Sequence, residues 1–159
     1  MSTATVHAYV AAAEPARGRM GMGVVFVDAH GRPLRKVGRA LPGGTSRGLG
    51  AFRGIVYALW NSRRLGCRQV VVYCPDRDVV AQINGEEDVA EEFVGSYLEV
   101  RALLHAYRAA RVECPQGDED SLWLGLAYEL ADAAMEGDVD ETVEDLPLWS
   151  APTEERSTA

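Results

Sequence analysis

The sequence predicts an α/β domain with a mixed five-stranded sheet and helices on both of its faces. Three strands, a helix, a strand, two helices, a strand and a helix follow one another along the chain, and this order is typical of a sheet covered on both sides. The chain has 159 residues, 47% hydrophobic and 25% charged, as expected for one globular domain. No apolar run reaches the roughly 18 residues of a membrane helix, and the N-terminus lacks a signal-peptide pattern. We therefore expect a cytoplasmic protein without membrane contact.

The first three elements are predicted strands, and the second and third form a hairpin. Residues 5–12 are an apolar run of strand length, and residues 23–28 (GVVFVD) are rich in β-forming side chains. After a turn at 29–32, a return strand extends from residue 33 to about residue 41. These strands account for the antiparallel part of the sheet.

A helix and a buried strand follow the glycine-rich loop that ends near residue 50. Thr45 or Ser46 can cap this helix, whose apolar residues recur at helical spacing to about Arg64, and Gly66 ends it. Residues 69–74 (QVVVYC) are a short apolar run between turn signals. Such a run is expected for a buried central strand.

The remaining elements are mainly helical. A short helix is predicted at 75–84 and a longer one at about 89–109. A brief strand at 111–114 and a last helix at about 121–135 follow. The folded domain is therefore expected to span residues 1–135.

Charge is distributed unevenly along the chain, whose net charge is −8. Residues 1–80 carry 12 Lys and Arg against four acids, whereas the other residues carry four Arg against 20 acids. Residues 136–159 are acidic, rich in Pro, Ser and Thr, and without helical or strand periodicity, which predicts an acidic flexible tail. The asymmetry suggests an anion-binding face or contact between oppositely charged surfaces, with solvated surface charge as the alternative.

The cysteines predict neither disulfides nor a metal site. Cys67, Cys74 and Cys114 form neither an even disulfide set nor a close metal-binding pair, and no histidine lies at zinc-binding spacing from them. We expect buried, reduced thiols, no structural metal and no cofactor.

Four strings resemble, in the right order, the ribonuclease H type 1 family across residues 5–134. The strings are GMGVVFVDAHGRPL, AFRGIVYAL, VVVYCPDRDVVAQINGE and VECPQG. The family cleaves the RNA strand of RNA/DNA hybrids with two metal ions held by four carboxylates. The resemblance therefore implies a ribonuclease H-like fold and a ligand that is RNA or an RNA/DNA hybrid.

The sequence departs from the family at the positions of those carboxylates. The aligned positions hold, in chain order, Val10 or Ala11, Ala51 or Gly50, Pro75 or Asp76, and Trp123 or Leu124. The position of the family's loop histidine holds Glu113 or Cys114. Because two hydrated divalent ions need several oxygen ligands, at most one carboxylate of four predicts a catalytically inactive domain.

Three functions remain open at this point. The first is nucleic-acid binding through the basic N-terminal half, at the loop after the first strand and the entry to the first long helix. The second is a protein-interaction or regulatory adaptor that uses the charge asymmetry and the tail motif LPLW. The third is a metal-dependent nuclease with relocated carboxylates.

The residues that carry these alternatives are as follows. The nucleic-acid candidates are Arg17, Arg19, Thr45, Ser46, Arg47 and Arg53. The adaptor candidates are Leu146, Leu148 and Trp149, in an acidic tail that can also cover the basic face as a phosphate mimic. The relocated ligands are Glu14, Asp76, Asp78, Asp118, Glu119 and Asp120, although Asp76 is also placed to cap a helix.

Overall fold

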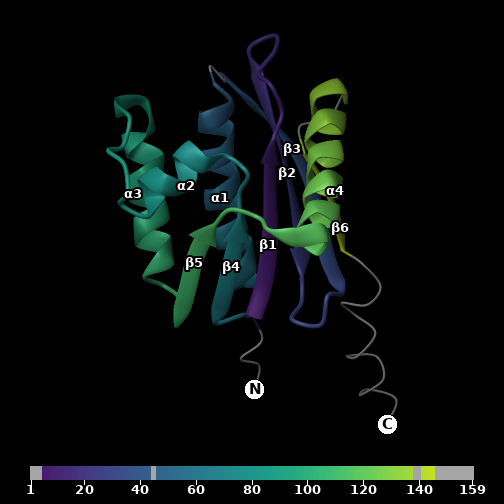
Figure 1. The fold of residues 1–159 in the computed structure, drawn as a ribbon. Helices are drawn as coiled ribbons and strands as arrows, with labels where there is room; N and C mark the ends of the chain where they lie inside the picture. The colour runs from purple at the N-terminus through teal and green to yellow at the C-terminus, as the bar shows by residue number, and fades with distance from the viewer. Residues whose placement is uncertain (1–4, 44–45, 138–140, 146–159) are drawn as a thin grey trace.

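The computed structural model describes residues 5–43, 46–137 and 141–145. These residues form a six-stranded sheet in the order β5-β4-β1-β2-β3-β6, with helices on both faces (Figure 1). The predicted α/β fold with a mixed sheet is confirmed, and the sheet has six strands instead of the expected five.

The middle of the sheet combines antiparallel and parallel pairs. β1 (Thr5–Ala12), β2 (Arg19–Val27) and β3 (Pro33–Pro42) form an antiparallel meander. β4 (Gln69–Tyr73) pairs parallel with β1, and β5 (Ala109–Glu113) pairs parallel with β4. Because β1 and β4 are parallel, their carboxyl ends lie at the same edge of the sheet, where ligands of α/β folds commonly bind.

The helices divide between the two faces. α1 (Arg47–Arg64), α2 (Arg77–Ile83) and α3 (Val94–Leu104) lie on one side, and α3 is preceded by a 3-10 turn, η1 (Glu91–Phe93). α4 (Gly117–Glu136) covers the other face, over β1, β2 and β3 (Figure 1).

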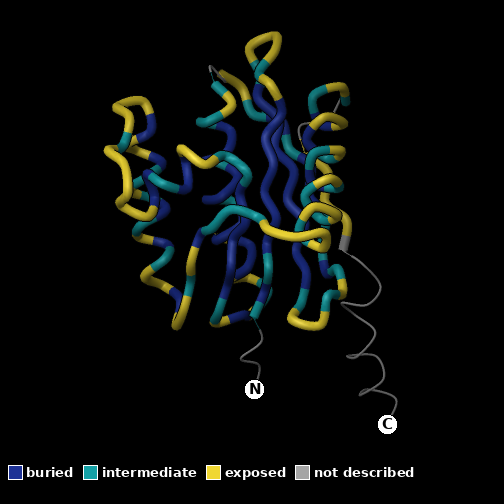
Figure 2. The backbone as a smooth tube through the Cα atoms, viewed as in Figure 1, coloured by how far each residue is buried: buried dark blue, intermediate teal, exposed yellow. Residues whose placement is uncertain are grey.

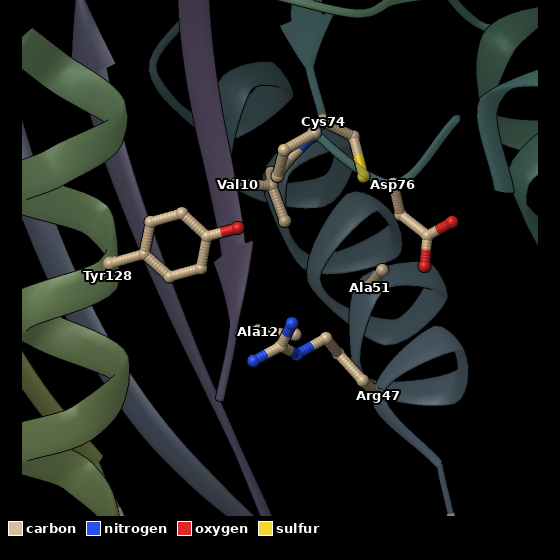
Figure 3. Close-up of a pocket in the computed structure, with 8 residues that line it drawn as sticks. Val10, Ala12, Arg47, Ala51, Cys74, Asp76 and Tyr128 are labelled. Carbon is tan, nitrogen blue, oxygen red and sulfur yellow. The ribbon is translucent and has the colours of Figure 1, made fainter. Parts of the chain in front are cut away.

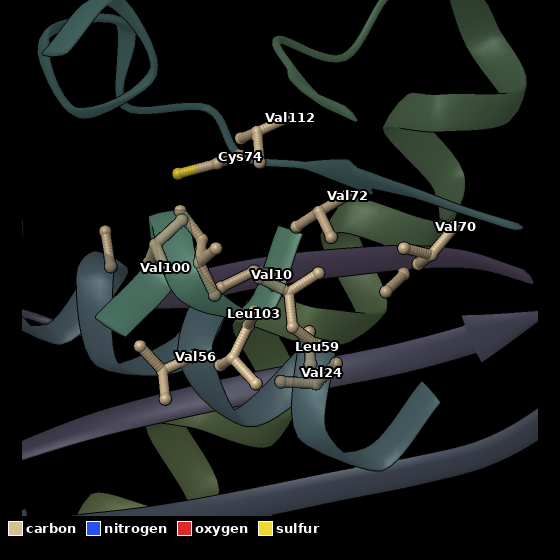
Figure 4. Packing of buried hydrophobic residues seen from close by; sticks show 14 of the residues in the cluster. Val10, Val24, Val56, Leu59, Val70, Val72, Cys74, Val100, Leu103 and Val112 are labelled. Carbon is tan, nitrogen blue, oxygen red and sulfur yellow. The ribbon is translucent and has the colours of Figure 1, made fainter. Parts of the chain in front are cut away.

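Alternation along the strands gives each face its own core. On β1, Ala8 and Val10 pack in the larger cluster with α1, whereas Tyr9 and Ala11 pack in the cluster beneath α4. Figure 2 shows the buried strands between the helical layers, and Figure 4 shows the valine- and leucine-rich packing of the larger cluster. The central strands are therefore buried on both faces.

Glycines on β2 bring α4 close to the sheet. A Cβ added at Gly23 would lie 1.9 Å from the carbonyl oxygen of Ala127, and one at Gly21 would lie 2.7 Å from that of Ala131. No side chain fits at either distance, so the backbone of α4 approaches the strand directly.

The predicted helix at 89–109 is wrong at both ends. Residues 91–93 form η1, α3 ends at Leu104, and β5 already begins at Ala109. Phe93 packs on Phe52 of α1 with ring centroids 5.0 Å apart, and the Tyr107 hydroxyl donates to the carbonyl of Leu59. These long-range contacts override the helical pattern of the sequence.

The sixth strand lies in the segment that was expected to be a flexible tail. β6 (Glu141–Asp145) pairs antiparallel with β3, so that expectation is wrong for these five residues. The register places Glu144 and Glu141 opposite Lys36 and Arg39, and these side chains form ion pairs at 3.1 and 3.9 Å. Opposite charges across the two strands favour this pairing, although the sequence of β6 does not alternate between apolar and polar residues.

Candidate nucleic-acid interface

A pocket of about 140 Å³ opens at the carboxyl ends of β1 and β4, beside the first turns of α1 (Figure 3). Strand ends, the N-terminal part of a helix and one side chain of α4 enclose it. Its lining residues are Val10, Ala12, Arg47, Ala51, Cys74, Pro75, Asp76 and Tyr128.

The floor of the pocket is apolar and buried. Val10, Ala51 and Cys74 are almost inaccessible to solvent, and burial raises the pKa of the Cys74 thiol to about 12. Of the two alignments that the sequence left open, the structure places Val10 and Ala51 at the pocket, whereas Ala11 packs on the opposite face of the sheet. Neither Val10 nor Ala51 offers an oxygen ligand to a cation.

Among the described residues, Asp76 is the one carboxylate that lines the pocket, and it already has a structural role. It is the N-cap of α2, and its Oδ1 accepts a hydrogen bond from the backbone N–H of Val79 at 3.2 Å. The prediction that Asp76 caps this helix is therefore confirmed. Because one carboxylate oxygen already accepts this hydrogen bond, only part of the carboxylate remains available to a ligand.

The contribution of α4 differs from the sequence alignment. Trp123 and Leu124 pack against the core beneath α4, and Tyr128 instead lines the pocket. In Figure 3 the Tyr128 ring points from α4 toward β1. Burial raises the pKa of the Tyr128 hydroxyl, which therefore stays protonated and able to donate a hydrogen bond at neutral pH.

Arg47 brings a positive charge to the pocket. Its guanidinium extends from the first turn of α1 into the space between the helix and β1 (Figure 3), and it pairs with Glu14 at 3.1 Å. Both side chains are exposed, and an ion pair of this kind contributes about 1 kcal/mol or less. A phosphate can therefore replace Glu14 at little cost.

Two loops lie at the same end of the molecule as the carboxyl end of β1, and we call the surface that carries Arg17 and Arg47 the basic rim (Figure 1). The backbone N–H of Gly43, before α1, donates to the carbonyl of Gly18, in the β1–β2 turn, at 2.7 Å. Arg17, exposed and with a φ of 56°, lies in that turn. This hydrogen bond joins the turn that carries Arg17 to the segment that leads to α1, which begins at Arg47.

The other predicted nucleic-acid residues have separate positions. Ser46 caps α1 by accepting from the N–H of Leu49 at 3.2 Å, and Arg19 is half-buried at the start of β2. Arg53 does not reach the basic rim, because it pairs at 2.8 Å with Glu99 of α3. Thr45 lies outside the described residues.

The acids proposed as relocated metal ligands are spread over the domain. Glu14 pairs with Arg47, and Asp120 accepts from the Tyr9 hydroxyl at 2.8 Å on the α4 face of the sheet. Asp78, Asp118 and Glu119 are exposed. Within residues 5–43, 46–137 and 141–145, no three His, Cys, Asp or Glu side chains lie close enough together to hold a metal ion. The residues at the pocket do not fit a pair of divalent ions.

The adaptor hypothesis rests on the charge asymmetry and on the tail motif LPLW. Leu146, Leu148 and Trp149 lie outside the described residues, so that hypothesis stays a prediction. None of the helices in the described part of the chain combines the length and apolar character needed to cross a membrane.

The fold and the pocket define a ribonuclease H-like domain, and comparisons with known proteins agree. The RNase H1 of the archaeon Halobacterium salinarum NRC-1 superposes with a TM-score of 0.73 at 20% identity, over 83% of this chain and 98% of that one. The N-terminal RNase H domain of rv2228c from Mycobacterium tuberculosis gives 0.66 at 24% identity, over 82% and 97% of the two chains. LC11-RNase H1, in a complex with an RNA/DNA hybrid, gives 0.66 at 20% identity, over 82% and 99%.

The family assignment rests on the sequence itself. The model of the reverse transcriptase-like family matches residues 9–114. The chain therefore belongs to the reverse transcriptase-like family. No curated protein matches it.

Proposed function

We propose that this domain binds RNA or RNA/DNA hybrids without cleaving them. The observation that carries the proposal is the pocket, where a guanidinium projects over an apolar floor with a single carboxylate. Arg47 supplies locally the kind of positive charge that bound metal ions would otherwise supply. Such a site favours a phosphate group as a ligand.

The floor argues against cleavage. Two-metal hydrolysis needs oxygen ligands that hold both ions and position the attacking water and the leaving oxygen. Val10 and Ala51 offer hydrocarbon at this place, and Tyr128 offers a protonated hydroxyl. Asp76 alone, with one oxygen used as a helix cap, cannot hold two hydrated dications.

The basic rim and the relatives argue for binding. Arg17 and Arg47 lie at one end of the domain, and Arg47 stands at the start of α1, where the first backbone N–H groups have no helical acceptor and Ser46 caps only that of Leu49. LC11-RNase H1 and a foamy viral protease-reverse transcriptase have both been solved with an RNA/DNA hybrid. A hybrid is therefore the first ligand to test.

The test is the affinity of the protein for a fluorescently labelled RNA/DNA hybrid, measured by anisotropy at several salt concentrations. The double variant Arg17→Glu/Arg47→Glu is expected to weaken binding by about tenfold or more and to reduce the salt slope by about two, since each lost phosphate contact lowers that slope by about 0.9. Arg111→Glu is the matched control, because Arg111 is exposed on β5, the opposite edge strand from β6. If the double variant and the control bind alike, the basic rim is not the interface.

A further inference from the structure

A second basic surface lies along α1, away from the pocket. A groove of about 610 Å³ runs between α1, β3 and β6, and it shares no lining residue with the pocket. We call it the arginine groove, after four of its residues. Its charged and aromatic lining includes Arg35, Arg39, Arg53, Arg64, Tyr57 and Trp60, together with the carboxylates of Glu141 and of Glu99, which pairs with Arg53 at 2.8 Å.

The arginine groove already holds an anion. The carboxylate of Glu141, on β6, accepts a hydrogen bond from the Tyr57 hydroxyl at 2.8 Å and lies 3.9 Å from the Arg39 guanidinium. Burial, followed by the bond to Glu141, raises the pKa of Tyr57 to about 12, so the hydroxyl remains a donor. Arg39 also lies 5.3 Å from the centroid of the Tyr57 ring. These side chains are arranged to receive a negatively charged oxygen.

The part of the arginine groove beyond Glu141 is open to solvent. Trp60 is 46% exposed, although tryptophan is highly buried on average, and Arg64 one turn further along α1 is exposed as well. Arg53, Tyr57, Trp60 and Arg64 follow one another at helical spacing on the same side of the helix. An accessible indole can stack on a nucleic-acid base while the neighbouring guanidinium groups bind phosphates.

The side chains of the arginine groove favour a ligand that carries phosphates. β3 is paired with β2 on one side and with β6 on the other, so a peptide could add to the sheet here only at the outer edge of β6. That strand is acidic (ETVED), whereas the side chains of the groove that face a ligand are largely basic. All four cationic side chains among the described residues that line the groove are arginines. The planar guanidinium group donates hydrogen bonds in a geometry that matches phosphate oxygens.

We propose that the arginine groove binds single-stranded nucleic acid, with phosphates on the arginines and a base stacked on Trp60. The Glu141 carboxylate competes with a phosphate for Arg39 and Tyr57, and β6 thereby weakens binding. The ion pairs that hold β6 are exposed and exchange readily. This proposal goes beyond hybrid binding at the basic rim and does not depend on it, because the two surfaces are separate.

The experiment measures the affinity of the full chain for a short labelled oligo-dT strand by fluorescence anisotropy. Trp60→Ala is expected to weaken binding by about fivefold or more, the loss of one stacked base. Arg64→Glu is expected to weaken it as well, and Glu141→Gln to strengthen it by up to about fivefold, since it removes one competing exposed ion pair. Trp60→Phe keeps an aromatic face and is expected to retain most of the affinity, which separates stacking from any change in folding.

Controls separate this proposal from the proposed function. Arg111→Glu is expected to bind oligo-dT like the unmodified chain, and Trp60→Ala is expected to leave hybrid binding at the basic rim unchanged. Equal oligo-dT affinity for the unmodified chain, Trp60→Ala and Arg64→Glu would overturn the proposal, whatever happens with the hybrid. Binding of a labelled acidic peptide, ETVEDLPLW, without binding of oligo-dT would also overturn it and assign the groove to a protein ligand.

Discussion

The floor of the pocket and its basic rim differ in both burial and charge. Val10, Ala51 and Cys74 form a buried apolar floor, whereas Arg17 and Arg47 are exposed and charged. The floor belongs to the hydrophobic core and stabilises the fold, and the rim contributes little to stability. Under the proposed function, the difference teaches that the residues that bind phosphate lie at the exposed rim, whereas the positions that align with the family's carboxylates lie in the buried floor, so the two can be changed separately.

The largest expected effect follows from placing a carboxylate in the floor. Val10→Asp is expected to lower the free energy of unfolding by about 3–5 kcal/mol, because it buries a charge without a partner. Arg47→Ala, on the rim, is expected to change it by less than about 1 kcal/mol. Urea denaturation followed by circular dichroism measures both. Val10→Asn, in which asparagine has the shape of aspartate without its charge, isolates the electrostatic part of the loss of stability. Equal losses for the floor and rim variants would contradict the comparison.

A second prediction concerns the close packing of α4 on β2, which positions Tyr128 at the pocket. Gly23→Ala is expected to cost about 1–3 kcal/mol of stability, because its Cβ overlaps the backbone of Ala127 and forces α4 outward. Tyr128 would move with the helix. Gly125→Ala is the matched control, since that glycine is exposed on α4 with open space around it, and there alanine is expected to stabilise by up to about 1 kcal/mol. Thermal unfolding of both variants checks the prediction, and a neutral Gly23→Ala would show that α4 is not held as described.

The smallest expected effect lies at the opposite end of β1 from the pocket. Burial, and then the positive charge of Arg111, lower the pKa of His7 below its ordinary 6.5. The unfolded chain therefore binds more protons than the folded one between that lowered pKa and 6.5. Stability should fall as the pH drops through this interval and then level off.

His7→Gln should remove this step. The Nδ1 of His7 lies 2.9 Å from the Tyr73 hydroxyl, and glutamine retains a polar group that can bond it. Denaturation midpoints between about pH 5 and pH 8, the range in which histidine titrates, provide the measurement. An unchanged pH profile in the variant would assign the step to another group.

The sequence predicted best where the signal is local. The apolar runs of β1 and β4, the hairpin of β2 and β3, and the capping of α1 by Ser46 are confirmed, because strand formers, turn residues and caps act over a few positions. The acidic strand β6 was not predicted, because the positive charges that favour its pairing lie on β3, about a hundred residues earlier in the chain. Leu122, although apolar and on a helix that covers the sheet, is 66% exposed, because α4 turns its other side to the glycines of β2.

The candidate site was predicted in part. The alignment with the family left two residues open at each carboxylate position, and the structure brings Val10, Ala51, Pro75 and Asp76 from three of these positions to one pocket. The roles of Arg17 and Arg47 in nucleic-acid binding stay predictions. Tyr128 gave no local signal, because its position depends on how closely α4 approaches the sheet. The arginine groove does leave a signal in the sequence, the helical spacing of Arg53, Tyr57, Trp60 and Arg64, but of these four only Arg53 was a nucleic-acid candidate.

One measurement tests most directly the claim that binding and cleavage are separated in this domain. A labelled RNA/DNA hybrid is incubated with the purified full chain in Mg²⁺ or Mn²⁺, and anisotropy and the integrity of the RNA strand are followed in the same samples. The account predicts a bound hybrid with intact RNA, even with protein in excess over the hybrid. Cleavage by substoichiometric protein that disappears in Asp76→Asn would contradict it, because the remaining carboxylate would then support metal-dependent catalysis.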